Sequence, residues 1–236
     1  MALGNSDRAL RTYVKIYQKN EKDSEGKVVY TDKVSLWIDD DNGTDVRYSE
    51  NKSQGTITPK KGFWFEFIEG IITKVLVDDK NKFGTMLELT LVDEGKEYQL
   101  SVNVDGIYGR SLAERISGLS ELGKFVKITP YSFKARDEKT GQERELRGVS
   151  FEVDGEKQDS HFFDKEKQVS LHDYPAYPEG YVNLPDAQKK IFRAQRELFL
   201  TQFINTKFTP LNEAYANANA PVSAPASEAD AEDVVW

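Results

Sequence analysis

Cationic side chains alternate with aromatic rings in two stretches of the sequence, and this combination can bind a nucleic-acid strand. Lysine and arginine neutralise phosphates, and an aromatic face stacks on a base. The first stretch covers residues 47–64, where four cations and three rings accompany a single carboxylate. Its candidate binding residues are Arg47, Tyr48, Lys52, Lys60, Lys61, Phe63 and Trp64. The alternative is a solvated loop that runs into a core strand.

The second stretch covers residues 124–136. Val126 and Ile128 suit the interior of a strand, so the opposite face would carry the cations and rings. The candidate binding residues are Lys127, Tyr131, Phe133, Lys134 and Arg136, with Tyr108 and Arg110 of a short predicted helix as weaker candidates. The alternative is a second small core under the N-terminal strands or the C-terminal helix.

The residue types on which most enzymes depend are scarce or scattered. The chain has no cysteine and two histidines, His161 and His172, which excludes thiol nucleophiles and multi-histidine metal sites. It has no glycine-rich phosphate loop and no Ser-His-Asp arrangement. The clustered carboxylates fall in turn-like segments such as residues 39–43, and calcium or magnesium binding there is a minor alternative. We therefore expect no enzyme, no catalytic residue, no metal and no cofactor.

The 236-residue chain has a net charge of −8, but the charge is unevenly distributed. Residues 211–236 contain no Lys or Arg, and their acidic residues are Glu213, Glu228, Asp230, Glu232 and Asp233. Residues 1–210 therefore carry only −3. An acidic protein is normally a poor candidate for nucleic-acid binding. Here most of the acidity lies in the tail, so local basic patches matter more than the overall charge.

Residues 211–236 predict a disordered acidic tail. Between residues 214 and 227 the composition is dominated by Ala, Asn, Pro and Ser, which cannot bury enough apolar surface to offset the entropy of ordering. Acidic residues then precede Val234, Val235 and Trp236. This pattern predicts a peptide that docks into partner proteins or covers the protein's own basic groove. Its partner-binding residues would be Asp230, Glu232, Asp233 and Trp236.

Strand-like patterns dominate residues 12–153. Residues 13–17, 28–30 and 34–38 predict an N-terminal β-subdomain, about residues 12–62. Five further strands are expected over residues 63–77, 85–92, 96–104, 124–133 and 146–153, with a helix over 108–119. A longer helix is expected over residues 183–210, where Pro185 and Asp186 suit a first turn. We expect this helix to pack on a body formed by residues 1–182.

The order of long strand, strand, strand, helix, strand, strand is that of a five-stranded OB-fold barrel, here about residues 63–153. Gly70 predicts the bend that lets the first strand pair on both sides. Glu66 marks that strand's exposed face, so Trp64 should be accessible, and Phe65 and Phe67 should be buried. Such barrels bind oligonucleotides across their second and third strands and two flanking loops, here residues 78–84 and 135–145. A generic β-sandwich is the alternative.

This architecture, together with the tail sequence SEADAEDVVW, resembles the phage-type single-stranded DNA-binding proteins (SSBs). The family's tails usually end in Phe after consecutive acids, whereas the acids here alternate with Ala and precede Trp236. The resemblance implies a non-enzymatic protein that coats single-stranded DNA without sequence specificity during phage replication or recombination. It also implies recruitment of replication or recombination proteins through the tail.

Two other classes of protein remain open. One is a virion structural or protein-interaction OB module, and the other is an RNA-binding protein. No apolar run approaches the ~20 residues of a membrane span, and the first ten residues lack the apolar core of a signal peptide. We therefore expect a soluble protein of the cytoplasm, the host's cytoplasm if a phage encodes it, without a membrane partner. The oligomeric state stays open.

Overall fold

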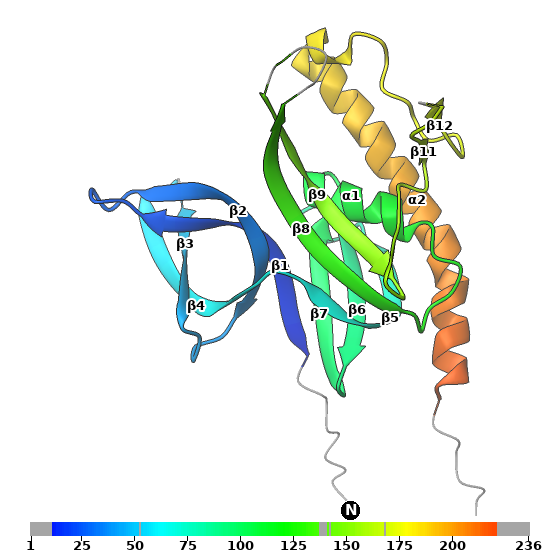
Figure 1. The fold of residues 1–236 in the computed structure, drawn as a ribbon, viewed down its shortest axis with the longest axis horizontal. Helices are drawn as coiled ribbons and strands as arrows, with labels where there is room; N and C mark the ends of the chain where they lie inside the picture. Colours follow the sequence, from blue (N-terminus) through cyan, green and yellow to red (C-terminus); the bar gives the residue numbers. More distant parts are fainter. Residues whose placement is uncertain (1–10, 52, 137–140, 142, 168, 221–236) are drawn as a thin grey trace, which may run out of the picture.

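The structure, a computed structural model, describes residues 11–51, 53–136, 141, 143–167 and 169–220. Figure 1 shows a mainly β protein in which one long C-terminal helix lies beside an open sheet of ten strands. The expected β-rich body and C-terminal helix are therefore confirmed. No helix in the described part of the chain is long and apolar enough to cross a membrane.

The elements fall into an N-terminal, a central and a C-terminal group. The N-terminal group is β1 (Thr12–Lys22), β2 (Val28–Asp39), β3 (Asp45–Asn51) and β4 (Thr56–Phe65). The central group is β5 (Ile68–Asp78), β6 (Met86–Asp93), β7 (Lys96–Asn103), α1 (Ile107–Ile116), β8 (Phe125–Arg136), β9 (Glu143–Val153) and β10 (Glu156–Lys157). The C-terminal group is β11 (Phe163–Asp164), β12 (Val169–Ser170), the 3-10 turn η1 (Tyr181–Asn183) and α2 (Asp186–Ala218).

Hydrogen-bonded neighbours in the sheet follow the order β10-β9-β8-β5-β6-β7-β1-β2-β4-β3. Strand β5 pairs with β8 over residues 68–71 and with β6 over residues 71–78. Gly70 has a φ of 151°, and a Cβ at this position would lie 2.8 Å from the carbonyl oxygen of Val92. Only glycine fits there. The irregularity predicted at Gly70 therefore lies next to the point where β5 changes neighbours.

The single strand predicted over residues 63–77 is two strands in the structure. Strand β4 ends at Phe65, and β5 begins at Ile68. Strand β4 pairs with β2 and β3, whereas β5 pairs with β6 and β8. The chain thus leaves the N-terminal strands at residues 66–67 and enters the central ones. Glu66 is the only polar residue among residues 63–68, so the sequence pattern does not reveal the break.

The central strands do not close into the predicted five-stranded barrel within the described residues. Strand β7 pairs in parallel with β1, where Tyr13 lies opposite Gln99. Helix α1 packs against β9, and the Ser111 hydroxyl accepts a hydrogen bond from the Val149 amide at 3.0 Å. The two edges that a closed barrel would join are each covered by another element, and the sheet stays open.

The N-terminal strands curl until β3 approaches β1 again, as Figure 1 shows at the left. The buried Asn20 side chain bridges the two strands. Its Nδ2 donates to the Tyr48 carbonyl at 2.7 Å, and its Oδ1 accepts from the Tyr48 amide at 2.9 Å. A neighbouring strand would supply the same two hydrogen bonds. Inside the curl, Trp37 is buried, and its ring centroid lies 4.6 Å from that of Trp64.

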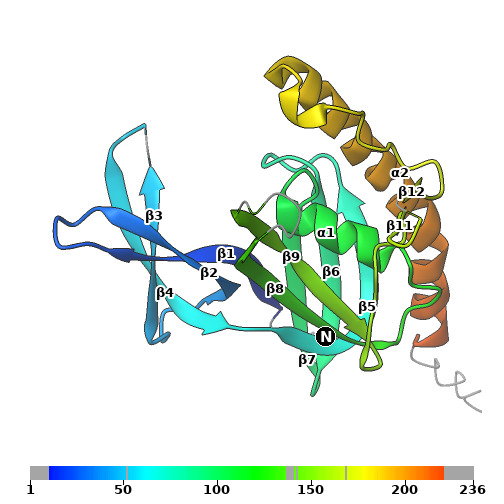
Figure 2. The same cartoon turned by 45° about the horizontal axis from the view of Figure 1, so that its top comes forward.

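Helix α2 lies on the opposite side of the central strands from the N-terminal curl (Figure 2) and packs against β5. Its apolar residues Leu200, Ile204 and Phe208 are fully buried. Burial of this apolar face stabilises the helix, because each such side chain contributes roughly 1.5–3 kcal/mol.

The predicted boundary between helix and tail at residue 210 is wrong, because α2 continues to Ala218. After Ile71, strand β5 no longer pairs with β8, and its edge there needs other partners. The Asn212 side chain accepts from the Val75 amide at 3.0 Å and donates to the Val75 carbonyl at 2.6 Å. These contacts hold residues 211–218 in the helix.

Candidate nucleic-acid interface

A groove of about 530 Å³ crosses the outer face of β6, β7 and β1. Because Tyr13 pairs with Gln99, Tyr13 and Lys15 point to the same side of the sheet as Gln99 and Ser101. The intervening residues of β7, such as Leu100, are buried in the core. The pleat of the sheet therefore places a row of rings, amides and one cation on the accessible face.

Aromatic rings stand along this groove. They come from β1, from the turn after β5 and from the first turn of α1, and they are Tyr13, Tyr17, Phe83 and Tyr108. Tyr13 is 58% exposed and Phe83 is 72% exposed. Such exposure is unusual for large rings in a folded protein, and it leaves their faces free to stack on a planar ligand.

Hydrogen bonds hold the turn that carries Phe83. The Asn81 side chain accepts from the Phe83 amide at 3.0 Å, and the Asn103 side chain donates to the Phe83 carbonyl at 3.1 Å. The Lys82 ammonium lies 4.9 Å from the centre of the Phe83 ring. The exposed ring is thus presented on a fixed turn with a cation beside it.

Tyr108 connects the groove to strand β9. Burial raises the pKa of its hydroxyl, while Arg147 lowers this pKa and Glu145 raises it again. The hydroxyl is therefore protonated at neutral pH and can donate a hydrogen bond. Both charged neighbours belong to β9, although no residue of β8 or β9 lines the groove itself.

The outer end of β8 carries part of the second predicted stretch. The rings of Tyr131 and Phe133 lie 5.6 Å apart, and Phe133 is 52% exposed. Lys134 is exposed and lies 3.8 Å from the Asp32 carboxylate, and Arg136 donates to the Gly141 carbonyl at 3.0 Å. We refer to these four residues of β8 as the β8 ledge. The predicted stacking pair and its adjacent cations are thus found together.

Lys127 belongs to the same strand but not to the ledge. Its ammonium lies 3.9 Å from the centre of the Phe67 ring, near the pairing of Lys127 with Glu69. Phe67 and Phe65 are 40% and 43% exposed, so the prediction that they are buried is wrong. They lie at the break between β4 and β5, where the chain passes between two parts of the sheet and leaves their rings partly exposed.

The first predicted stretch forms the β3–β4 hairpin, and its candidate binding residues do not share one surface. The Arg47 guanidinium lies 4.0 Å from the centre of the Tyr17 ring and packs inside the curl. Trp64 is only partly exposed because it packs on Trp37, so its predicted accessibility is not found. The Lys22 ammonium lies 5.1 Å from the Tyr48 ring.

The remaining members of that stretch spread over both faces of β4. Lys60 and Lys61 are exposed and, as consecutive strand residues, point to opposite sides. Phe63 is partly buried on the face opposite Trp64, with its ring 6.4 Å from that of Phe65. None of the described candidates of this stretch lines the groove, but Arg47 contacts the groove residue Tyr17. Phe63 lines a neighbouring cavity with Tyr13 and Lys15.

Arg110 points away from the groove. It donates to the Tyr177 hydroxyl at 3.0 Å and to the Asp105 carbonyl at 3.2 Å. Several predicted residues lie outside the described part of the chain: Lys52, Asp230, Glu232, Asp233 and Trp236. The same holds for residues 137–140 and 142 of the loop between β8 and β9.

The sequence pattern does not single out Tyr13, Lys15, Tyr17 or Phe83 as binding residues. The signal for the first three was present as an alternation of rings and cations on one face of β1, but the same pattern fits an ordinary core strand. Phe83 stands alone in a polar turn, where a large ring has no packing role.

Within the described residues, no group of three or more His, Asp or Glu side chains is placed to hold a metal ion. The groove itself contains one lysine and one glutamate, and the Glu88 carboxylate accepts from Gln99 at 2.7 Å. Its chemistry is therefore that of aromatic faces and amides, with cations at its ends.

The chain matches no protein-family model, no curated protein and no solved structure.

Proposed function

We propose that the protein binds single-stranded DNA without sequence preference and is not an enzyme. The observation that carries this proposal is the groove across β6, β7 and β1, with exposed rings from Tyr13 and Phe83. Every base has a face that can stack on such rings, at ~1–3 kcal/mol per base, so stacking binds single strands without reading sequence. Paired bases in a duplex do not offer these faces.

The strand order supports an OB-type core. The neighbours β9-β8-β5-β6-β7 follow the order in which the five strands of an OB barrel pair before closure. On this assignment β6 and β7 are the second and third strands, and the turn that carries Phe83 is the first of the two binding loops. The groove then occupies the face that OB folds use for oligonucleotides. Strand β1 occupies the edge of β7 that closure would otherwise use.

The cations suggest a path for the strand. Lys15 lies in the groove and Lys82 at the turn, while Lys134 and Arg136 lie on the β8 ledge. We propose that a single strand stacks along the groove and continues past Tyr108 to the ledge. Because the groove has few cations, the salt dependence should be that of a few phosphate contacts.

In the cell, such a protein would coat exposed single strands during replication or recombination, and its tail would recruit partner proteins. This role comes from the resemblance to phage-type SSBs. It places the protein in the cytoplasm of the host if a phage encodes it.

A titration of labelled oligo(dT) with the full-length protein tests the proposal. Fluorescence anisotropy at low and moderate salt should show tighter binding to oligo(dT) than to a duplex of equal length. Tighter binding to oligo(U) would favour an RNA-binding protein. No binding to any of the three would favour a virion structural or protein-interaction module.

A further inference from the structure

A second and larger cavity, of about 990 Å³, lies on the other side of α1. Its walls come from α1, β9, residues 160–177 and α2. None of the residues lining it lines the groove described above. We refer to it as the arginine pocket, because Arg110, Arg147 and Arg196 line it together with a single carboxylate, Glu114.

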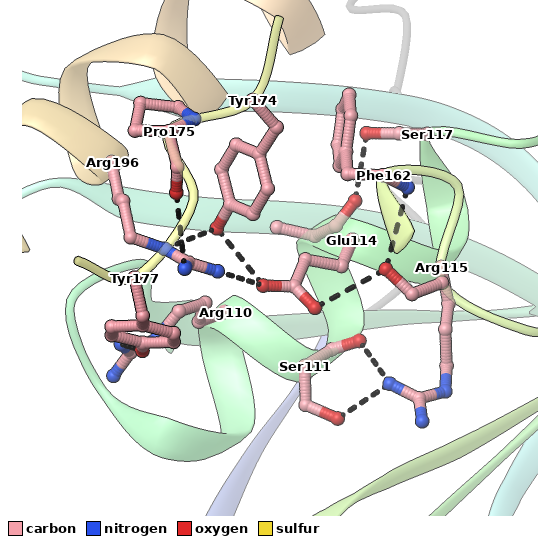
Figure 3. A network of polar contacts seen from close by, with 12 residues as sticks. Arg110, Ser111, Glu114, Arg115, Ser117, Phe162, Tyr174, Pro175, Tyr177 and Arg196 are labelled. Carbon is pink, nitrogen blue, oxygen red and sulfur yellow. Dashed lines mark hydrogen bonds and ion pairs between the residues drawn. The ribbon is translucent and has the colours of Figure 1, made fainter. Parts of the chain in front are cut away.

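One wall of the arginine pocket is a fixed polar network, shown in Figure 3. The Arg196 guanidinium donates to Glu114 at 3.1 Å, to the Tyr174 hydroxyl at 3.0 Å and to the Pro175 carbonyl at 3.3 Å. It also lies within 4.1 and 4.2 Å of the centres of the Tyr174 and Tyr177 rings. Arg196 therefore neutralises Glu114 and braces two aromatic rings against α2.

Arg110 leaves the pocket positive. Arg147 pairs with Glu145 at 2.5 Å, so the Arg147 charge is already neutralised from outside the lining. Within the described residues, Arg110 donates two hydrogen bonds. Both acceptors are neutral oxygens, the Tyr177 hydroxyl and the Asp105 carbonyl. The Arg110 charge is thus available to an anionic ligand, and guanidinium groups bind carboxylates with two parallel hydrogen bonds.

Apart from three serines, the rest of the lining is aromatic and apolar, including Phe162, Phe163, Tyr174, Tyr177 and Val169. A ligand that fits this surface combines carboxylates with apolar side chains and a large ring. Residues 227–236 of the chain itself, SEADAEDVVW, have this composition: four acids, two valines and one tryptophan. By contrast, the lining of the groove holds one lysine and one glutamate, so it has less positive charge for an acidic peptide than the arginine pocket.

The chain is long enough to bring this segment to the pocket. Arg196 lies in the pocket, and α2 ends at Ala218. At ~1.5 Å per residue the helix covers about 33 Å between these two residues. The 18 residues from 219 to 236 reach up to ~60 Å when extended. The segment can therefore return along α2 to the pocket of its own molecule.

We infer that residues 227–236 dock into the arginine pocket of their own chain, with acids on the arginines and Trp236 among the rings. This inference does not rest on the binding of DNA. It differs from the expectation that the tail covers a DNA-binding groove, because the charges place the tail on the other side of α1.

Disulfide trapping in the full-length protein tests the inference, since the natural sequence has no cysteine. One variant combines Val235→Cys with Ala176→Cys, which lies in the arginine pocket. The matched control combines Val235→Cys with Ser101→Cys, which lies in the groove. Each single-cysteine variant is also reacted with a small disulfide reagent. The rate of this reaction corrects the trapping rates for differences in the accessibility of the cysteines. Under mild oxidation without nucleic acid, intramolecular trapping should be about tenfold faster at Ala176 than at Ser101.

The charge of the pocket is tested in the same assay. When Arg110→Gln is added to the variant that combines Val235→Cys with Ala176→Cys, disulfide trapping should become several-fold slower. High salt should slow trapping in the same way. The melting temperature of each variant shows whether it is folded. Equal or faster trapping at Ser101, no trapping at Ala176, disulfides only between molecules, or no effect of Arg110→Gln would each overturn the inference.

Discussion

Asn20 exchanges two hydrogen bonds with the backbone of Tyr48 and so joins β1 to β3, although these strands are not paired. Asn212 of α2 does the same for Val75, at the edge of β5 that β8 leaves unpaired. In both places a side-chain amide replaces a missing strand. The open sheet is thus completed by side chains at its discontinuities.

The first prediction concerns this bridge. Asn20→Ala leaves the Tyr48 amide and carbonyl without their partner, and an unsatisfied buried group costs about 1–3 kcal/mol. The free energy of unfolding in urea should fall by about that amount. Asn42→Ala, in an exposed turn, is the control and should have little effect. If the two variants were equally stable, Asn20 would not hold the curl closed.

The second prediction concerns the rings of the groove. Tyr13→Ala and Phe83→Ala should each weaken binding to oligo(dT), because each removes a stacking surface worth ~1–3 kcal/mol. The dissociation constant should rise roughly five- to 150-fold while the salt dependence is unchanged. Phe125→Ala is the control, since Phe125 is 41% exposed but lies outside the groove. An equal loss of affinity in Phe125→Ala would show that the groove rings contribute no more to binding than another exposed ring.

The third prediction concerns Lys15. Lys15→Ala should weaken binding and reduce the slope of log affinity against log salt by about 0.7, the value for one phosphate contact of a single strand. Lys157→Ala on the short strand β10 should leave the slope unchanged. The pair Lys60→Ala and Lys61→Ala tests the β3–β4 hairpin in the same way. A slope that Lys15→Ala does not alter would remove Lys15 from the path.

The fourth prediction concerns pH. His161 stacks on His172, with ring centroids 4.3 Å apart. Burial lowers the pKa of His161, and the charges of His172 and Lys207 lower it further. The unfolded chain therefore takes up a proton below about pH 6.5 that the folded protein resists.

The free energy of unfolding should accordingly decrease as the pH falls from about 7.5 to about 5.5. His161→Phe keeps a ring in place and removes the titrating group, so this decrease should become smaller. Urea unfolding at several pH values measures both proteins. An unchanged pH dependence in His161→Phe would assign the effect to other groups.

Much of the central fold was predictable, because apolar and polar residues alternate along a strand wherever one of its faces is buried. The strands β6 to β9 and helix α1 lie within a few residues of their predicted positions, apart from the outer ends of β8 and β9. Strand β3 has the largely polar sequence DVRYSEN, in which only Val46 and Tyr48 alternate with polar residues, and this pattern is too short to predict a strand. Residues 28–30 and 34–38 belong to one strand, β2, whose middle residues face solvent.

The candidate site was less predictable, because it depends on contacts between distant segments. The parallel pairing of β1 with β7 brings Tyr13 beside Gln99, 86 residues away, and no local pattern encodes this. The partial covering of Trp64 likewise follows from Trp37 on another strand. The aromatic pair on the β8 ledge was predictable, since Tyr131 and Phe133 are neighbours on one face of one strand.

Photo-crosslinking tests the central claim most directly. Oligo(dT) containing iododeoxyuridine is bound to the full-length protein, irradiated, and the modified residues are identified by mass spectrometry. We expect adducts on the groove rings Tyr13, Tyr17, Phe83 and Tyr108, with further adducts on Tyr131 or Phe133. Adducts confined to the β3–β4 hairpin or to the arginine pocket, with none on the groove rings, would contradict the account.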